Sequence, residues 1–324
     1  MIFIWLLLLL IGFIFLWKGA DLLIDESVSL AKTLRVPAYL IGFTVVAFGT
    51  SLPELIVNIF ASIKGEDSVV FGNIIGSNIS NILLILGLSI FFTATRFNPK
   101  SIKSNLKNIS LVSLAWVMIM SLFSTNIPTI PQDKIKVFES LELNWIGAIF
   151  LLTVFVGVLI KEHQNNPQKE STIQENPSSP LKSLLLMTSS CLILFVGGKC
   201  VVEGALGLAQ LLHLSKAFVS LFIVALGTSL PELATAIAGI KKNQTSLVLG
   251  NIFGSNIFNI CLILSLSALV QPLSLDKKLV FDIAVMMTAP FLLYALSFLR
   301  HAKLCGFLSV SVYASYILLT YIRL

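Results

Sequence analysis

Two glutamates inside apolar stretches are the residues of this chain best suited to do chemistry. Glu54 ends the sequence Gly-Thr-Ser-Leu-Pro-Glu at 49–54, and Glu232 ends an identical copy at 227–232. Each copy lies in an apolar run long enough to cross a bilayer, where a carboxylate is costly and marks a functional site by default. No basic residue lies near either glutamate within its apolar run and could neutralise it. We therefore expect the two carboxylates to bind a cation or a proton.

These two copies belong to a longer internal repeat with an offset of 178 residues. In the apolar segment after each glutamate, Gly-Asn-Ile-Ile-Gly-Ser-Asn-Ile-Ser-Asn at 72–81 matches Gly-Asn-Ile-Phe-Gly-Ser-Asn-Ile-Phe-Asn at 250–259. More than half of the aligned positions between 42–88 and 220–266 are identical. Identity at this level over two apolar segments indicates that one structural unit occurs twice.

The composition is that of a polytopic membrane protein. Hydrophobic residues make up 56% of the 324 positions and charged residues only 12%, about half of what a soluble domain carries. The net charge of +6 then reflects the loops and does not indicate a nucleic-acid partner. The four cysteines are scattered through apolar segments without paired spacing, so we expect small core residues there and no disulfide or metal cluster.

Apolar runs predict an all-α protein with ten transmembrane helices in two sets of five. A polar, proline-containing stretch at 162–182 separates the sets and predicts a linker. The expected domains are therefore a first repeat at 1–161 and a second repeat at 183–324. The expected spans lie near 1–23, 37–63, 68–93, 105–124, 143–161, 183–211, 215–240, 246–270, 279–299 and 304–322.

Basic residues in the loops predict the orientation of the chain. With the N-terminus outside, thirteen Lys and Arg residues fall on the inner side and seven on the outer side, which follows the positive-inside rule. The linker at 162–182 is then cytoplasmic. Because each repeat has five spans, the second repeat enters the membrane from the opposite side. The two repeats are thus expected to be inverted, as in many secondary transporters.

Inverted repeats would bring Glu54 and Glu232 together near the middle of the membrane. Pro53 and Pro231 each remove a backbone donor, so the helices are expected to break there and to line a site. The carboxylates, the freed carbonyl groups and four hydroxyl groups would form an all-oxygen set that suits a hard cation such as calcium. The hydroxyl groups belong to Thr50, Ser51, Thr228 and Ser229.

A purely structural interpretation applies to some of the other repeated residues. Gly72-x-x-x-Gly76 and Gly250-x-x-x-Gly254 are helix-contact motifs in their own right. The repeated asparagines and serines of the same segments could join helices by hydrogen bonds. We expect the glycines to serve packing, whereas the two intramembrane glutamates need a bound ion.

The repeated motifs resemble those of the calcium/cation antiporter superfamily, and within it the sodium/calcium exchanger-like proteins of prokaryotes. Both copies of Gly-Thr-Ser-x-Pro-Glu and of Gly-Asn-x-x-Gly-Ser-Asn are complete, and the resemblance extends over essentially the whole chain. It implies exchange of calcium for sodium by alternating access, with the first and sixth spans sliding over the ion-binding spans. The calcium ligands that it implies are Glu54, Glu232 and the carbonyl groups of Thr50 and Thr228. The sodium sites would add Ala47, Ser51, Ser77, Ala225, Ser229 and Ser255.

One departure from the family pattern concerns the end of the second motif. Exchangers of this group often carry an aspartate at one of two positions that are here Asn81 and Asn259. The central site therefore offers two formal negative charges, which match one calcium or two sodium ions. We expect either a different coupling ratio or counter-ion, or a water and a proton at the middle position. The repeat Gly-Asn-Ala-x-Glu, usual in the proton-coupled branch, is absent.

The sequence thus predicts a calcium antiporter driven by sodium, with calcium/proton exchange as the alternative. A passive cation channel is a further alternative, which would need no sodium gradient. An enzyme is not expected, because no nucleophile, histidine or metal cluster accompanies the glutamates. The expected partners are the transported cations and the lipid bilayer, without a cofactor or nucleic acid. The short linker and the lack of a regulatory insert favour a bacterial inner (plasma) membrane.

Overall fold

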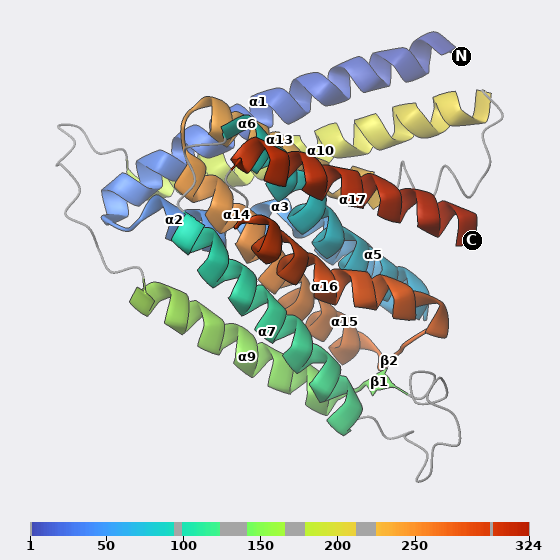
Figure 1. Ribbon diagram of the computed structural model, residues 1–324. Coiled ribbons are helices and arrows are strands. Elements are labelled where there is room, and N and C mark those ends of the chain that lie inside the picture. The colour runs from blue at the N-terminus through green and yellow to red at the C-terminus, as the bar shows by residue number, and fades with distance from the viewer. Residues whose placement is uncertain are drawn as a thin grey trace, which may run out of the picture.

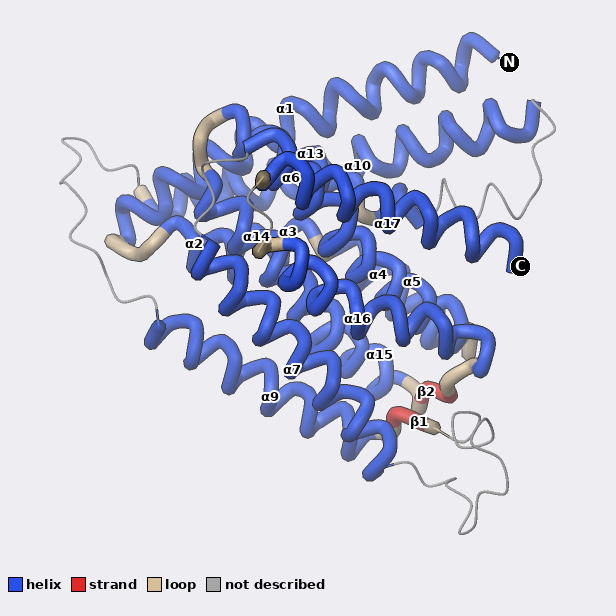
Figure 2. Tube along the Cα trace, in the orientation of Figure 1, coloured by secondary structure: helices blue, strands red, loops and turns tan. Residues whose placement is uncertain are grey.

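The computed structural model describes residues 2–93, 99–123, 141–165, 179–211, 225–298 and 301–323. Almost all of them are helical, and Figures 1 and 2 show the helices packed side by side as rods. The prediction of an all-α polytopic membrane protein is confirmed. Seven of the described helices are long and apolar enough to cross a membrane, and one bent helix pair makes an eighth span.

Helices of the first half of the chain are interrupted near the repeated motifs. The described elements up to residue 165 are α1 (Ile2–Leu34), α2 (Ala38–Ile41), η1 (Gly42–Val46), α3 (Ala47–Thr50), α4 (Leu52–Ile63), α5 (Asp67–Ile79), η2 (Ser80–Ile85), α6 (Leu86–Thr93), α7 (Pro99–Phe123), β1 (Glu142–Leu143) and α9 (Trp145–Asn165). Here η1 and η2 are π-helical turns, in which the hydrogen bonds span one residue more than in an α-helix.

The elements of the second half follow the same order except for the strand, which comes before the fourth span and not before the fifth. They are α10 (Pro180–Leu211), α12 (Ala225–Thr228), α13 (Leu230–Lys241), α14 (Thr245–Ile257), the π-helical η4 (Phe258–Ile263), α15 (Leu264–Val270), β2 (Leu273–Ser274), the 3-10 turn η5 (Lys277–Leu279), α16 (Val280–Leu296) and α17 (Ala302–Arg323). A described helix therefore lies at each of the ten predicted spans. The first part of the seventh predicted span, 215–224, lies outside the described residues.

Several predicted boundaries need correction. The first helix does not end near residue 23 but continues to Leu34, so its charged residues Asp21, Asp25 and Glu26 lie inside the helix. At about 1.5 Å per residue, such a helix is longer than the hydrocarbon core is thick. The expected linker is shorter at both ends, because α9 continues to Asn165 and α10 begins at Pro180.

The long helices α1 and α10, which are equivalent in the two repeats, run antiparallel and in close contact (Figure 1). A Cβ atom on Gly19 would lie 3.2 Å from the backbone N of Leu194, and one on Gly204 would lie 2.8 Å from the carbonyl O of Trp5. Positions late in α1 therefore face positions early in α10, and the reverse holds at the other end. Antiparallel equivalent helices are what inverted repeats require.

The turns between α4 and α5 and between α13 and α14 have the same geometry in both repeats. Gly65 has a φ of 72° and its equivalent Asn243 a φ of 58°, the left-handed conformation that glycine and asparagine tolerate best. The N–H of Glu66 donates to the carbonyl of Ala61 at 2.9 Å, and the N–H of the equivalent Gln244 donates at 2.8 Å in the same pattern. The repeats thus agree in backbone detail as well as in sequence.

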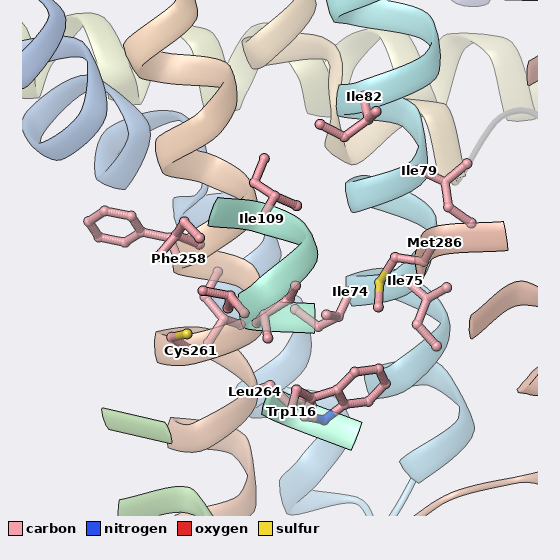
Figure 3. Close-up of a cluster of buried hydrophobic side chains, with 14 of the residues drawn as sticks. Ile74, Ile75, Ile79, Ile82, Ile109, Trp116, Phe258, Cys261, Leu264 and Met286 are labelled. Atoms are coloured by element: carbon pink, nitrogen blue, oxygen red, sulfur yellow. The ribbon is translucent and has the colours of Figure 1, made fainter. Parts of the chain in front are cut away.

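The interior is built around the two most buried spans, α5–η2–α6 and α14–η4–α15. In the apolar window of Thr245–Val270, 94% of the residues are buried, against 17% in the window of α1. Figure 3 shows Ile74 and Ile75 of α5, Trp116 of α7 and Met286 of α16 gathered in this core. The expectation that the cysteines are small core residues is confirmed for the three buried ones, Cys191, Cys261 and Cys305.

Packing by glycine is confirmed in the second repeat. A Cβ atom on Gly250 would lie 2.2 Å from the carbonyl O of Tyr39, and one on Gly254 would lie 2.3 Å from that of Phe43. The backbone of α14 therefore touches the backbone of α2 and η1. At the equivalent Gly72, no atom lies within 4 Å of such a Cβ among the described residues.

A two-stranded antiparallel ribbon, β1 with β2, was not predicted. Glu142 pairs with Ser274 and Leu143 pairs with Leu273, so the start of α9 is tied to the end of α15. Both leucines are fully buried. The ribbon joins one end of the outer helices to the core (Figure 2).

Candidate cation site

Both Pro-Glu motifs lie at helix breaks with the same backbone geometry. The helix α3 ends at Thr50 and α4 begins at Leu52, with a bend of 45° between the two parts of the span. Between them, Ser51 has φ −87° and ψ 7°, and the equivalent Ser229 has φ −87° and ψ 6°. The predicted breaks are therefore present. Each proline occupies the first turn of the new helix, where a missing N–H costs no hydrogen bond.

Both glutamates are buried in the first turn of their helices. Glu54 and Glu232 are each only 1% exposed. The backbone N–H of each glutamate, one of the donors that the start of a helix leaves free, lies near its own carboxylate and favours the charged form. The positive end of the helix dipole also favours a negative charge there. The helix breaks therefore supply part of the stabilisation that two buried carboxylates need.

Contacts across the repeats bring the two glutamates into one site. The Ser51 hydroxyl donates to Glu232 Oε1 at 3.2 Å, and the Ser77 hydroxyl donates to Glu54 Oε1 at 3.4 Å. The hydroxyl groups of Ser229 and Ser77 lie 3.5 Å apart and connect the two halves. The negative charges of the two carboxylates repel each other. An ion between them would relieve this repulsion.

The site region is rich in buried oxygen acceptors that have no hydrogen-bond partner among the described residues. They are Glu54 Oε2, Glu232 Oε2, Asn78 Oδ1, Asn81 Oδ1, Asn256 Oδ1 and Asn259 Oδ1. A buried polar atom without a partner costs roughly 1–3 kcal/mol, so such a set calls for an explanation. All of these atoms are hard oxygen ligands. Each repeat contributes three of them, and the three of one repeat occupy the same sequence positions as the three of the other. This chemistry fits a sodium or calcium ion.

Two π-helical turns place the last asparagine of each motif. Asn81 lies in η2 and Asn259 in η4, each at the second residue of its turn, and both are 1% exposed. One extra residue in a turn rotates the following part of the helix and leaves carbonyl groups less tightly bonded. Such turns occur often at functional sites. The turns were missed from the sequence, because an apolar helix with one added residue keeps its overall pattern.

The other residues of the predicted site lie close to this centre. Ser255 and Thr50 lie near the Glu232 carboxylate, and Thr228 lies near that of Glu54. Ala47 is buried one turn before Thr50, and its carbonyl O accepts the N–H of Ser51 at 3.0 Å. Ala225 is the first residue of α12. The assignment of individual residues to calcium or sodium stays a prediction.

Sequence reasoning missed the specific role of the first asparagine in each motif. Thr50 Oγ1 donates to Asn251 Oδ1 at 3.1 Å, and Thr228 Oγ1 donates to Asn73 Oδ1 at 3.3 Å. Each bond joins the helix break of one repeat to the following span of the other. The two bonds are equivalent under the offset of 178 residues, which is the signal that could have revealed them.

Comparison with known proteins agrees with this geometry. A family model described as sodium/calcium exchanger protein matches residues 4–160 and 182–322, which is most of the chain. The chain belongs to the sodium/calcium exchanger protein family. The family is one of membrane transporters, and the chain is a cation antiporter. Its many apolar helices make it a multi-pass integral membrane protein.

Relatives match over nearly their full length. The chain is 32% identical to the inner membrane protein YrbG of Escherichia coli over 83% of this chain and 81% of that protein. It is 30% identical to the sodium/calcium exchanger MaX1 of Methanosarcina acetivorans over 87% of this chain and 88% of the relative. A solved structure of the sodium-calcium exchanger NCX_Mj superposes with a TM-score of 0.79 and 30% identity, covering 98% of this chain and 99% of the other.

Proposed function

We propose that this antiporter exchanges calcium for sodium through the site between Glu54 and Glu232. The observation that carries the proposal is the buried set of unpartnered oxygens around two carboxylates, contributed equally by both repeats. Calcium prefers six to eight oxygens with some negative charge among them. The relatives named as sodium/calcium exchangers support sodium as the counter-ion. No resident cofactor is needed, because the ions are the cargo.

The charge of the site suggests how the ions are coupled. Its acidic groups among the described residues are Glu54 and Glu232, while Asn81 and Asn259 contribute neutral amides. Two negative charges balance one calcium or two sodium ions. A third sodium ion would be held by neutral dipoles alone in a region of low dielectric, which is unfavourable. We therefore propose exchange of two sodium ions for one calcium ion.

Uptake of radiolabelled calcium into proteoliposomes tests the counter-ion. Vesicles loaded with sodium and diluted into sodium-free buffer are expected to take up calcium, whereas vesicles loaded with choline are not. A pH gradient without sodium is expected to drive no uptake. Uptake that follows the pH gradient and ignores sodium would replace this proposal by calcium/proton exchange. Uptake without any gradient of a second ion would indicate a channel.

Electroneutral exchange is a separate expected result. Because two sodium ions carry the charge of one calcium ion, a potassium diffusion potential set with valinomycin should leave the initial rate of sodium-driven uptake unchanged. Asn259→Asp adds a third carboxylate beside the first two, so we expect its uptake to become sensitive to the potential. A wild-type rate that changes with the potential, or cooperative use of three or more sodium ions, would contradict the proposed ratio.

The expected location is the plasma membrane of a prokaryotic cell. YrbG of E. coli is named as an inner membrane protein, and the chain is similar to it over most of its length. The predicted orientation places the N-terminus outside and the segment between the repeats in the cytoplasm.

A further inference from the structure

The threonine of each Pro-Glu motif has two possible acceptors in the opposite repeat for its single hydroxyl proton, and Thr50 Oγ1 also lies 3.4 Å from the carbonyl O of Ala47 in its own helix. Thr50 Oγ1 donates to Asn251 Oδ1 at 3.1 Å, but it can also donate to the carboxylate of Glu232. Thr228 stands in the same position, with Asn73 Oδ1 at 3.3 Å and the carboxylate of Glu54 as the other acceptor. In both cases the threonine belongs to one repeat and both acceptors belong to the other.

The choice of acceptor matters for a bound cation. A hydroxyl group has one proton, so a proton directed at the asparagine is withheld from the carboxylate. A carboxylate that accepts fewer hydrogen bonds keeps more of its lone pairs for a metal ion. Without the asparagine, the threonine would be free to donate to the carboxylate and so to compete with the cation. The asparagine thus controls how much of the glutamate is available to the ion.

Further contacts hold Asn251 in the required orientation. Its Nδ2 donates to Thr235 Oγ1 at 3.1 Å, and the one hydroxyl proton of Thr235 is shared between the carbonyl groups of Pro231 at 2.7 Å and Glu232 at 2.9 Å. Because the amide nitrogen is engaged as a donor, the amide oxygen must face Thr50. Asn251 and Thr235 are both 1% exposed, so water does not compete for these bonds.

We propose that Asn251 and Asn73 are positioning residues for transport, which draw the hydroxyl protons of Thr50 and Thr228 away from the carboxylates of Glu232 and Glu54. The proposal rests on the function proposed above, since it specifies how the same site is kept ready for a cation. Neither asparagine needs to touch the ion. Each acts through a threonine and so across the boundary between the repeats.

The hydrogen bonds of Thr50 to Asn251 and of Thr228 to Asn73, which we call the two bridges, differ in how the asparagine is held. Asn73 Nδ2 donates to Asn58 Oδ1 at 3.0 Å, but Asn58 Nδ2 is buried and has no hydrogen-bond partner in the part of the chain that the structure describes. Asn58 occupies the position of Ala236 in the second repeat, and Thr235 that of Val57 in the first. The bridge through Asn251 therefore ends on the backbone of α13, while that through Asn73 ends on an amide with a free donor. We expect Asn251 to have the larger effect.

A double-mutant cycle on sodium-driven calcium uptake tests the proposal. Asn251→Ala is expected to raise the half-saturating calcium concentration by roughly three- to ten-fold, the effect of one hydrogen bond, with the maximal rate nearly unchanged, because the Thr50 proton then competes for the carboxylate of Glu232. Adding Thr50→Val removes that proton, so the double variant should have a lower half-saturating concentration than Asn251→Ala alone. Ser267→Ala is the matched control, since Ser267 is buried on the same span and its hydroxyl bonds within its own helix.

The outcomes separate this proposal from the function on which it rests. If wild type shows no sodium-driven uptake, the proposed function is wrong. If wild type transports but Asn251→Ala leaves the half-saturating concentration unchanged, or Thr50→Val does not lower it in the Asn251→Ala background, only the positioning role is overturned. Should Asn251→Ala not yield folded protein, the equivalent pair decides: Asn73→Ala should raise the half-saturating concentration, and adding Thr228→Val should lower it again. The absence of this recovery would contradict the proposal.

Discussion

Glu54→Gln is expected to abolish sodium-driven calcium uptake, and Glu232→Gln should do the same. Each substitution keeps the size of the side chain and removes one of the two charges that face the ion. Removing one partner of a buried charge interaction costs about 3–5 kcal/mol, which corresponds to a loss of at least about 100-fold in affinity. Because the two glutamates occupy equivalent positions, we expect losses of similar size. Uptake of radiolabelled calcium at several calcium concentrations measures them.

Glu162→Gln provides a matched control for these variants. Glu162 lies in α9 and is 5% exposed, and its carboxylate accepts a hydrogen bond from Asn108 at 3.0 Å, outside the cation site. The same chemical change at a buried position should therefore leave transport intact. Normal transport by Glu54→Gln would refute the assigned site. Equal loss in all three variants would attribute the loss to the folding of the protein and not to the ion.

The parts of the site that follow from local sequence could be predicted. A proline in an apolar helix removes one donor wherever it occurs, so the breaks before Glu54 and Glu232 follow from the residues alone. The fixed offset between the copies then indicates that the two breaks are equivalent. An odd number of spans per repeat indicates that they face each other. These steps need no knowledge of packing.

Features that depend on contacts between distant segments could not be predicted. The ribbon of Glu142–Leu143 with Leu273–Ser274 joins residues far apart in sequence, and neither strand is long enough to show a periodicity. The helix α1 continues past residue 23 although Asp21 and Asp25 would be costly in a bilayer. The ammonium group of Lys242 at the end of α13 lies 2.7 Å from Asp25 and 3.5 Å from Asp21 and balances their charge.

The same distinction explains the bridging asparagines. Asn251 and Asn73 lie in a motif with several other polar residues, and the spacing along the helix does not show which of them face the other repeat. Their partners, Thr50 and Thr228, belong to the opposite half of the chain. Only the inverted arrangement of the repeats brings them together. The sequence indicates which residues are repeated, and the packing decides which of them interact.

Gly250→Val is expected to prevent the correct assembly of the protein. A Cβ atom at this position would lie 2.2 Å from the carbonyl O of Tyr39 and 2.8 Å from the backbone N of Phe43. Since these are backbone atoms, no side-chain rotation can relieve the overlap, and α14 would have to move away from α2 and η1. Overpacking of a core usually costs about 1–3 kcal/mol, and contact between two backbones places this case at or above the upper end.

The displacement would also reach the cation site, because Asn251 follows Gly250 directly in α14. The bond between Asn251 and Thr50, 3.1 Å long, joins the same two spans that the substitution forces apart. We therefore expect Gly250→Val to lower the thermal midpoint in detergent and to remove the increase in that midpoint which calcium produces in wild type. Gly157→Val is the control, because Gly157 is exposed on α9 and a Cβ atom there has no atom of the described residues within 4 Å. If the two valine variants were equally stable and bound calcium equally well, close contact between α14 and η1 would not be needed to hold the site together.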